Sequence, residues 1–198
     1  MIKLIESCEK ENTRASINIV ISNNPNAKGL EYAKSKGIRV HSIDHKLFKD
    51  RKNFDEAVNE ILANNNIDFI CNAGFMRIHG EDFVKNWFNK HLNIHPALLP
   101  SFKGLNTHQR ALDQGVKFSG CTVHMVRSGV DEGPIISQAI TSVNSDDNAK
   151  LLSERILNLE HRLYPLCLQL FAEDLVSIDQ DKVIYTKKAL EMLNEFKV

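Results

Sequence analysis

The sequence predicts a single α/β domain over residues 1–198, in which helices cover both faces of a twisted, mostly parallel sheet. Short apolar runs, typical of buried strands, alternate with longer segments that have helical spacing. Glycine, asparagine and proline residues mark the boundaries between them. Because strands joined through helices usually run in parallel, this alternation favours a parallel sheet.

The first half of the chain predicts four strands. Each helix that precedes a strand has its apolar residues three or four apart, and glycine ends two of the segments. In order, the prediction is a helix over 2–8, a strand over 16–21, a helix over 27–36 that ends at Gly37, a strand over 38–40, a helix over 52–65, a strand from 67 that runs into a turn at Gly74, a helix over 80–89 and a strand over 91–94.

The second half predicts two further long strands and the longest helix. That helix covers 146–172, and its start is assigned to Asn144 or Ser145, which are good N-cap residues. The remaining elements are a helix over 107–114 that Gly115 ends, strands over 118–126 and 134–140, a small hairpin over 178–185 and a helix over 187–196.

Composition narrows the possible partners. Lys+Arg and Asp+Glu are equal at 25 each, so no net field attracts the chain to nucleic acid or to a membrane surface. No apolar stretch approaches the ~20 residues that span a bilayer, and charged residues from Glu6 to Glu11 interrupt any signal peptide. We therefore expect a cytoplasmic monomer or homodimer whose partners are small molecules, with no nucleic acid and no membrane.

The four cysteines, Cys8, Cys71, Cys121 and Cys167, are scattered and form no C-x-x-C pair. They are typical of buried free thiols in a reducing compartment. The eight histidines include no H-E-x-x-H motif and no Cys/His knuckle, so we expect no metal.

Two polar residues at a strand end carry the strongest functional signal. Asn93 and His95 lie two apart and point to the same side of an extended strand, which Pro96 then stops. Asp131 follows in a second loop, with Gly133-Pro134 behind it. An amide, an imidazole and a carboxylate at strand ends suit transfer of an acyl or formyl group. Singly, each has a structural alternative: a hydrogen-bonded histidine, an Asx turn or a turn aspartate.

Several segments, in this order, resemble the folate-dependent formyltransferases, and among them the enzymes that act on glycinamide ribonucleotide. The segments are Ala73-Gly74-Phe75-Met76-Arg77-Ile78, Leu92-Asn93-Ile94-His95-Pro96, Gly120-Cys121-Thr122-Val123-His124, Asp131-Glu132-Gly133-Pro134 and Glu160-His161-Arg162-Leu163-Tyr164-Pro165. The resemblance implies a Rossmann-like formyltransferase fold that moves a formyl group from 10-formyltetrahydrofolate, the co-substrate, to the amine of glycinamide ribonucleotide in purine synthesis, without a metal.

The resemblance also implies roles for individual residues. His95 matches the catalytic histidine, Asn93 the amide that holds the formyl oxygen, and Asp131 the carboxylate partnered with the histidine. Glu160 matches a region that contacts the ribonucleotide. The folate-binding positions are Arg51, Met76, Arg77, Ile78, His79, Asn93, Arg127, Ser128, Gly129, Val130 and Asp131. His79 departs from the family, where an apolar residue is usual. His124, Thr107 and His108 are assigned either to the cleft or to structural roles.

The start of the chain departs from the resemblance, because the strand and the glycine-rich phosphate loop expected there have no counterpart. Residues 1–8 align with the helix that follows that loop. Two interpretations stay open: a shortened chain, or a genuine short form with impaired nucleotide binding. Accordingly, two alternative functions remain: a formyltetrahydrofolate hydrolase that uses the same residues, or a folate-binding remnant without catalysis.

Overall fold

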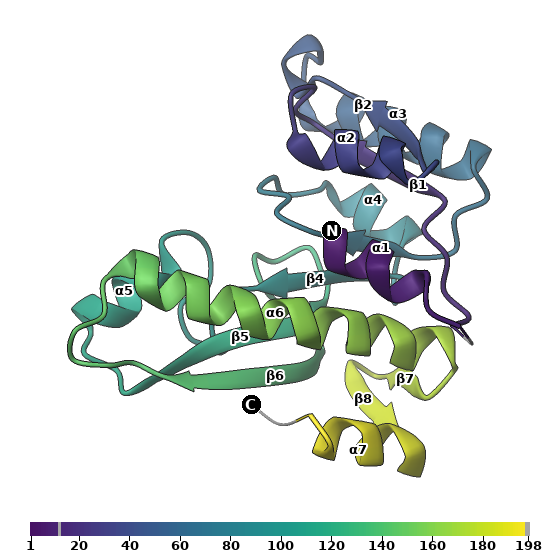
Figure 1. Ribbon diagram of the computed structural model, residues 1–198. Coiled ribbons are helices and arrows are strands. Elements are labelled where there is room, and N and C mark those ends of the chain that lie inside the picture. Colours follow the sequence, from purple (N-terminus) through teal and green to yellow (C-terminus); the bar gives the residue numbers. More distant parts are fainter. Residues whose placement is uncertain (12, 197–198) are drawn as a thin grey trace.

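The computed structural model describes residues 1–11 and 13–196 (Figure 1). Strands and helices alternate, as the sequence predicts. The elements are α1 (Ile2–Cys8), β1 (Ile19–Ser22), α2 (Lys28–Ser35), β2 (Arg39–Ser42), the 3-10 turn η1 (His45–Leu47), α3 (Arg51–Asn64), β3 (Ile70–Asn72), α4 (Glu81–Asn86), β4 (His91–His95), α5 (Thr107–Asp113), β5 (Phe118–Met125), β6 (Ile135–Ser142), α6 (Ala149–Ala172), β7 (Val176–Asp179), β8 (Lys182–Tyr185) and α7 (Lys187–Asn194).

A four-stranded mixed sheet in the order β3–β4–β5–β6 forms the centre of the molecule. β3 and β4 run parallel, whereas β4–β5 and β5–β6 are antiparallel. The predicted α/β class is confirmed, and the sheet is more antiparallel than the alternation of elements suggested. The reason is α5, a helix of only seven residues that precedes β5 without returning the chain to a parallel direction.

The other strands form two small separate sheets. β1 and β2 pair in parallel, with Ile19 opposite Arg39, and β7 and β8 form an antiparallel hairpin. β1 and β3 do not pair with each other. Between them lies a cavity of about 840 Å³, lined by both strands and by apolar side chains such as Leu4, Val58 and Phe171. Each of the two strands thus has one edge without a strand partner.

Helix α6 covers the main sheet and forms most of its core. It packs across β5 and β6, with α1 beside it (Figure 1). Its buried side chains recur at helical spacing and include Leu152, Ile156, Leu159, Leu163 and Cys167. A second core cluster, centred on Phe54 and Phe83, joins α3 and α4 to β1 and β3.

The predicted start of the long helix was wrong by a few residues. Its N-cap is Asn148, whose side chain accepts a hydrogen bond from the Leu151 amide at 3.0 Å. The expected caps, Asn144 and Ser145, lie in the preceding turn, where the Asn144 amide donates to Asp147 at 2.8 Å. Several neighbouring residues are able to cap here, so composition did not distinguish among them.

Candidate active site

The polar end of β4 lies in the middle of the main sheet. In the antiparallel register, Asn93 pairs with His124 of β5 and His95 pairs with Thr122. Pro96 follows directly and β4 ends at His95. The alternation along the strand therefore places both predicted residues beside β5, which adds its own polar side chains to the site.

His95 contacts oxygen atoms on both sides of its ring. Its Nε2 lies 2.9 Å from the Phe102 carbonyl oxygen, and because a carbonyl only accepts, Nε2 carries the hydrogen. Its Nδ1 lies 3.3 Å from Oδ2 of Asp131. That same carboxylate oxygen accepts a hydrogen bond from the Gly104 amide at 2.7 Å. Asp131 is therefore held beside a buried imidazole.

Asn93 is oriented by His124. The His124 ring donates from Nδ1 to the Met125 carbonyl oxygen at 2.9 Å, and burial lowers the pKa of this histidine. The neutral ring therefore has an unprotonated Nε2, which lies 3.2 Å from the Asn93 amide nitrogen. One N–H of Asn93 donates to His124, and the second is left for another acceptor. Oδ1 of Asp131 lies 3.8 Å from the same Nε2.

Sequence reasoning missed the role of Thr122. Its hydroxyl donates to the Ala97 carbonyl oxygen at 2.7 Å and accepts from the Leu99 amide at 3.0 Å. The Gln138 side chain of β6 donates to the same hydroxyl and to the Leu99 carbonyl. These bonds fix the segment after β4. The only signal in the sequence was the strand register opposite His95, which requires knowing that β4 and β5 pair.

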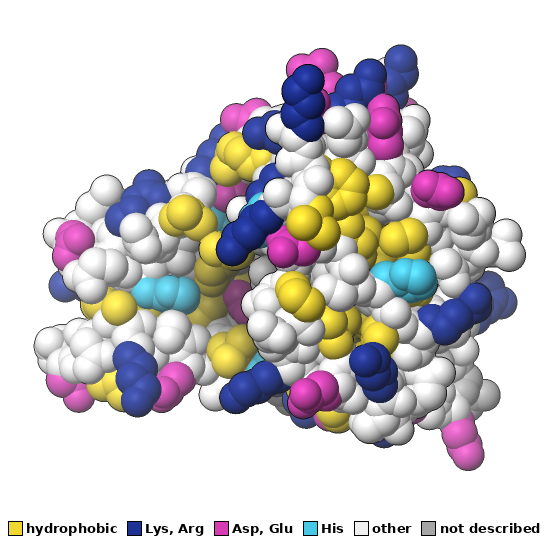
Figure 2. All heavy atoms as spheres, turned by 90° about the horizontal axis from the view of Figure 1, so that it is seen from above, with side chains coloured by type: hydrophobic (Ala, Val, Ile, Leu, Met, Phe, Trp, Pro, Cys, Tyr) yellow, Lys and Arg dark blue, Asp and Glu magenta, His cyan; other side chains and the backbone are white. Residues whose placement is uncertain are grey.

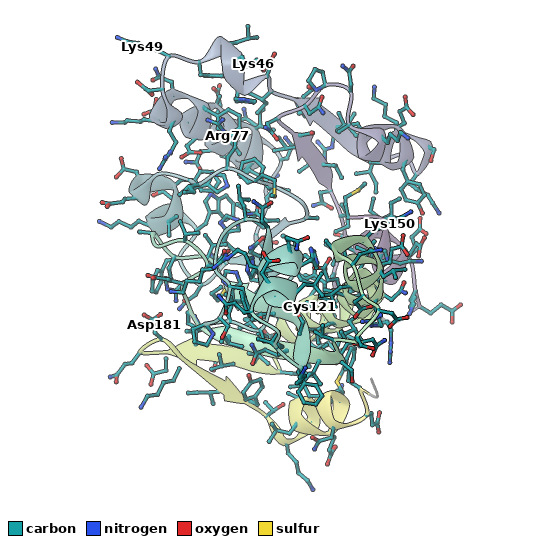
Figure 3. The ribbon with its side chains drawn as sticks, turned by 90° about the vertical axis from the view of Figure 1, so that its left-hand side faces the viewer. Lys46, Lys49, Arg77, Cys121, Lys150 and Asp181 are labelled. Atoms are coloured by element: carbon teal, nitrogen blue, oxygen red, sulfur yellow. The ribbon has the colours of Figure 1, made fainter. Side chains whose placement is uncertain are left out.

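The predicted folate segment presents apolar side chains to solvent. Met76 is 73% exposed and Ile78 is 47% exposed, and such large exposed apolar side chains indicate a binding surface. Figure 2 shows hydrophobic and histidine side chains gathered in and beside a hollow on one face. The Arg77 guanidinium lies 5.4 Å from the Phe54 ring centre, on the α3 side of the molecule (Figure 3).

His79 has a different orientation from its neighbours in that segment. Its Nδ1 lies 2.8 Å from Oδ1 of buried Asp55, and its ring stacks on Phe75 and Phe83. Oδ2 of Asp55 accepts from the Gly80 amide at 2.6 Å. The side chain of His79 is thus part of the core, and its backbone is what remains for a ligand.

The other predicted folate positions lie on two segments. Arg51 begins α3 and is exposed. Ser128, Gly129 and Val130 lie in the loop between β5 and β6 and are exposed. The Arg127 side chain at the start of this loop contacts Asp181 and Asn89.

Comparison with known proteins identifies the family. The sequence pattern described as "Formyl transferase" matches residues 1–168, most of the chain. The chain belongs to the formyl transferase family. This confirms the resemblance, and formyl group transfer is the chemistry of the family.

Individual relatives support the assignment of this chain to the formyl transferase family. The chain is 46% identical over 186 residues to "Trifunctional purine biosynthetic protein adenosine-3" of Homo sapiens, covering 93% of this chain but 18% of that protein. It therefore spans under a fifth of the length of that relative. It is 35% identical to "Phosphoribosylglycinamide formyltransferase" of Escherichia coli (strain K12), over 86% of this chain and 80% of that protein.

Solved structures share the fold. Glycinamide ribonucleotide transformylase 1 from Symbiobacterium toebii is 40% identical, with a TM-score of 0.90, and the match covers 94% of this chain and 88% of that one. A formyltetrahydrofolate deformylase from Pseudomonas syringae pv. tomato is 24% identical with a TM-score of 0.87, over 94% of this chain and 61% of that one, which shows the common fold.

The family resemblance places Glu160, on α6, beside the ribonucleotide. Burial raises the pKa of its carboxyl to about 7, and the neighbouring Met1 ammonium lowers that pKa by a smaller amount. One turn further along α6, the Tyr164 hydroxyl lies 2.8 Å from the Asn72 carbonyl oxygen and 3.1 Å from the Leu92 carbonyl oxygen, which ties α6 to β3 and β4.

Two other features are absent from the described residues. Across 1–11 and 13–196, no group of three or more His, Cys, Asp or Glu side chains is arranged to hold a metal ion. Within the same residues, no helix combines the length and apolarity needed to cross a membrane.

Proposed function

We propose that this chain transfers the formyl group of 10-formyltetrahydrofolate to the primary amine of glycinamide ribonucleotide. The observation that carries the proposal is the arrangement of Asn93, His95 and Asp131, since all three converge at the end of β4. A relative named for this activity, phosphoribosylglycinamide formyltransferase of Escherichia coli (strain K12), is 35% identical over 86% of this chain.

The site suits stabilisation of an oxyanion. When an amine attacks the formyl carbon, negative charge develops on the formyl oxygen. Asn93 has one N–H that is not taken by His124, and His95 has a ring hydrogen held only by the Phe102 carbonyl. Both donors are preorganised at partly or fully buried positions, where such hydrogen bonds contribute most to lowering the barrier.

Proton transfer is assigned to the His95–Asp131 pair. The attacking amine loses a proton and the departing folate nitrogen gains one, so the net reaction needs no external acid. Asp131 lies 3.3 Å from Nδ1 and orients the ring, which takes up the proton that the amine loses and delivers it to the leaving nitrogen. The route requires neither a covalent intermediate nor a metal.

The folate is assigned to the surface formed by Met76, Ile78 and the 127–131 loop. The flat faces of the folate rings are apolar, and they would cover the exposed apolar side chains of this surface. Backbone groups of Arg77 and His79 provide the polar contacts in this assignment, because the His79 ring is already bonded to Asp55.

The test is a formyl-transfer assay on the purified chain. Conversion of 10-formyltetrahydrofolate to tetrahydrofolate is followed by absorbance, with and without glycinamide ribonucleotide. Release of tetrahydrofolate that requires the ribonucleotide, with a formylated ribonucleotide detected by mass, supports the proposal. Release at the same rate without the ribonucleotide contradicts it and supports the hydrolase.

A further inference from the structure

Arg127 connects three segments that are far apart in the sequence. Its Nε and Nη2 lie 3.0 and 2.6 Å from Oδ1 of Asp181, in the turn between β7 and β8. Nη2 also donates to Oδ1 of Asn89 at 2.6 Å, and the guanidinium lies 4.0 Å from the centre of the Phe88 ring. The Arg127 side chain is 13% exposed and that of Asp181 is 61% exposed, so the ion pair is partly open to water.

The stem of Arg127 also supports the loop that follows β5. At Gly133, whose φ is +135°, a Cβ atom would lie 2.9 Å from Cγ of Arg127 and 2.3 Å from the Met125 carbonyl oxygen. The backbone of the loop therefore packs directly against the stem and against the end of β5. Any movement of Arg127 is transmitted to Gly133, which is two residues after Asp131 in the same tight loop.

Asp131 is the member of the site whose position depends on this loop. Unlike Asn93 and His95, it does not lie on a strand, and its φ of +50° requires a specific local backbone. Its contacts to Gly104 and to His95 are made by the side chain alone. The loop must therefore be held from outside, and Arg127 supplies one of the contacts that hold it.

We propose that Asp181, at the turn of the β7–β8 hairpin (Figure 3), is a positioning residue that acts through Arg127 to keep Asp131 beside His95. The proposal rests on the proposed formyl transfer. It assigns to the C-terminal hairpin, which contributes no residue to the site itself, control over the geometry of the catalytic carboxylate.

Two substitutions of Asp181 weaken or remove its contact with Arg127 and keep the hairpin turn. Gln180 and Asp181 both have positive φ, +47° and +58°, as in a type I′ hairpin turn. Asp181→Asn keeps a residue that accepts this conformation and removes the charge, and Asp181→Gly removes the whole side chain while it keeps the turn. Gln180→Gly is the matched control, because it changes the adjacent turn residue and leaves the contact to Arg127 in place.

The first measurement is formyl transfer by these variants. We expect Asp181→Gly to lower kcat about fivefold and Asp181→Asn to lower it less, with the KM for glycinamide ribonucleotide unchanged, because a partly exposed ion pair holds its partners only modestly. The thermal midpoint should stay close to that of Gln180→Gly. A kcat for Asp181→Gly equal to that of the control would overturn the proposal.

The second measurement does not depend on catalysis. The Gly104 amide donates to the Asp131 carboxylate, so its hydrogen exchange reports where that carboxylate lies. We expect this amide to exchange about fivefold faster in Asp181→Gly than in Gln180→Gly, while amides of β4 and β5 keep their rates. Unchanged exchange at Gly104, or equal acceleration across the sheet, would contradict the positioning role. Faster exchange at Gly104 in a chain without any turnover would retain the positioning role and reject only the formyl-transfer function.

Discussion

Asn93 on β4 and His124 on β5 face each other across an antiparallel pair, and the amide nitrogen of Asn93 lies 3.2 Å from Nε2 of His124. The hydrogen on His124 is fixed on the other ring nitrogen by the Met125 carbonyl. This single contact determines which end of the asparagine side chain donates, and in the proposed function the second N–H of that end is the donor for the developing oxyanion.

Asn93→Asp tests this assignment with almost no change of shape. A carboxylate at this position would repel the negative charge that forms on the formyl oxygen, so we expect kcat to fall about 100-fold or more. Steady-state formyl transfer measures the change, and the thermal midpoint serves as the control for an intact fold. A rate within threefold of the wild type would show that Asn93 does not contact the oxyanion.

The pair of His95 and Asp131 predicts a similar loss. We expect His95→Ala and Asp131→Ala each to lower kcat about 100-fold or more, with the circular dichroism spectrum unchanged, because each removes a member of the proton-transfer pair. Asp131→Asn is the more conservative variant, since asparagine accepts the φ of +50° and can still bond to the Gly104 amide. Turnover near the wild-type rate in either alanine variant would disprove these roles.

The buried ring of His91 predicts a dependence of stability on pH. This side chain is 1% exposed, and neither of its ring nitrogens has a hydrogen-bond partner among the residues that the structure describes. Burial first, and then the neighbouring His79 and His124, lower its pKa from 6.5 to about 3. Below pH 6.5 the unfolded chain therefore binds a proton that the folded chain does not, and the free energy of unfolding decreases as the pH falls.

His91→Leu isolates this effect. Between pH 7 and pH 5, His91 should account for a loss of about 2 kcal/mol in the free energy of unfolding, and the variant should lose correspondingly less. Urea unfolding at the two pH values measures the difference. His41→Leu, at an exposed position on β2, is the control. Equal losses in both variants would show that His91 is not the responsible group.

Glu160 predicts a pH dependence of a different kind. With a pKa of about 7, its carboxyl group ionises within the physiological range, and the ionised form is the better acceptor for ribonucleotide hydroxyls. We expect the KM for glycinamide ribonucleotide to fall as the pH rises from 6 to 8. Glu160→Gln should remove this dependence and raise KM about tenfold at pH 8, with kcat little changed. Glu154→Gln, exposed on the same helix, should behave like the wild type; a Glu160→Gln protein with unaltered KM would exclude the contact.

The parts of the site that belong to one strand were predictable from the sequence. Alternation along β4 placed Asn93 and His95 on one side, and Pro96 marked the end of the strand. Asp131 was identifiable only by its turn chemistry and the family resemblance. Its approach to His95 depends on a positive φ and on a hydrogen bond from the Gly104 amide. In the sequence, Gly104 is separated from Asp131 by α5 and β5.

Tertiary contacts, which local sequence patterns do not reveal, determine the burial of His79 and the direction of β5. Arg77 and His79 were both assigned to the folate-binding positions, and the sequence pattern did not show that Arg77 is only partly buried whereas His79 is buried. His79 lies in the core because α3 supplies Asp55 as a partner from 24 residues away. Likewise, β5 runs antiparallel because the seven-residue α5 does not carry the chain back to the other end of the sheet, which the alternation of elements did not reveal.

The unpaired edges of β1 and β3, which face each other across the 840 Å³ cavity, bear on how the protein behaves at high concentration. An extended apolar segment entering there would gain backbone partners on both sides at once, which makes the edges a template for self-association. The formal net charge of zero at pH 7 supplies no repulsion against it. We therefore expect a peptide of strand length that fills the cavity between β1 and β3 to raise the solubility of this chain more than added surface charges do.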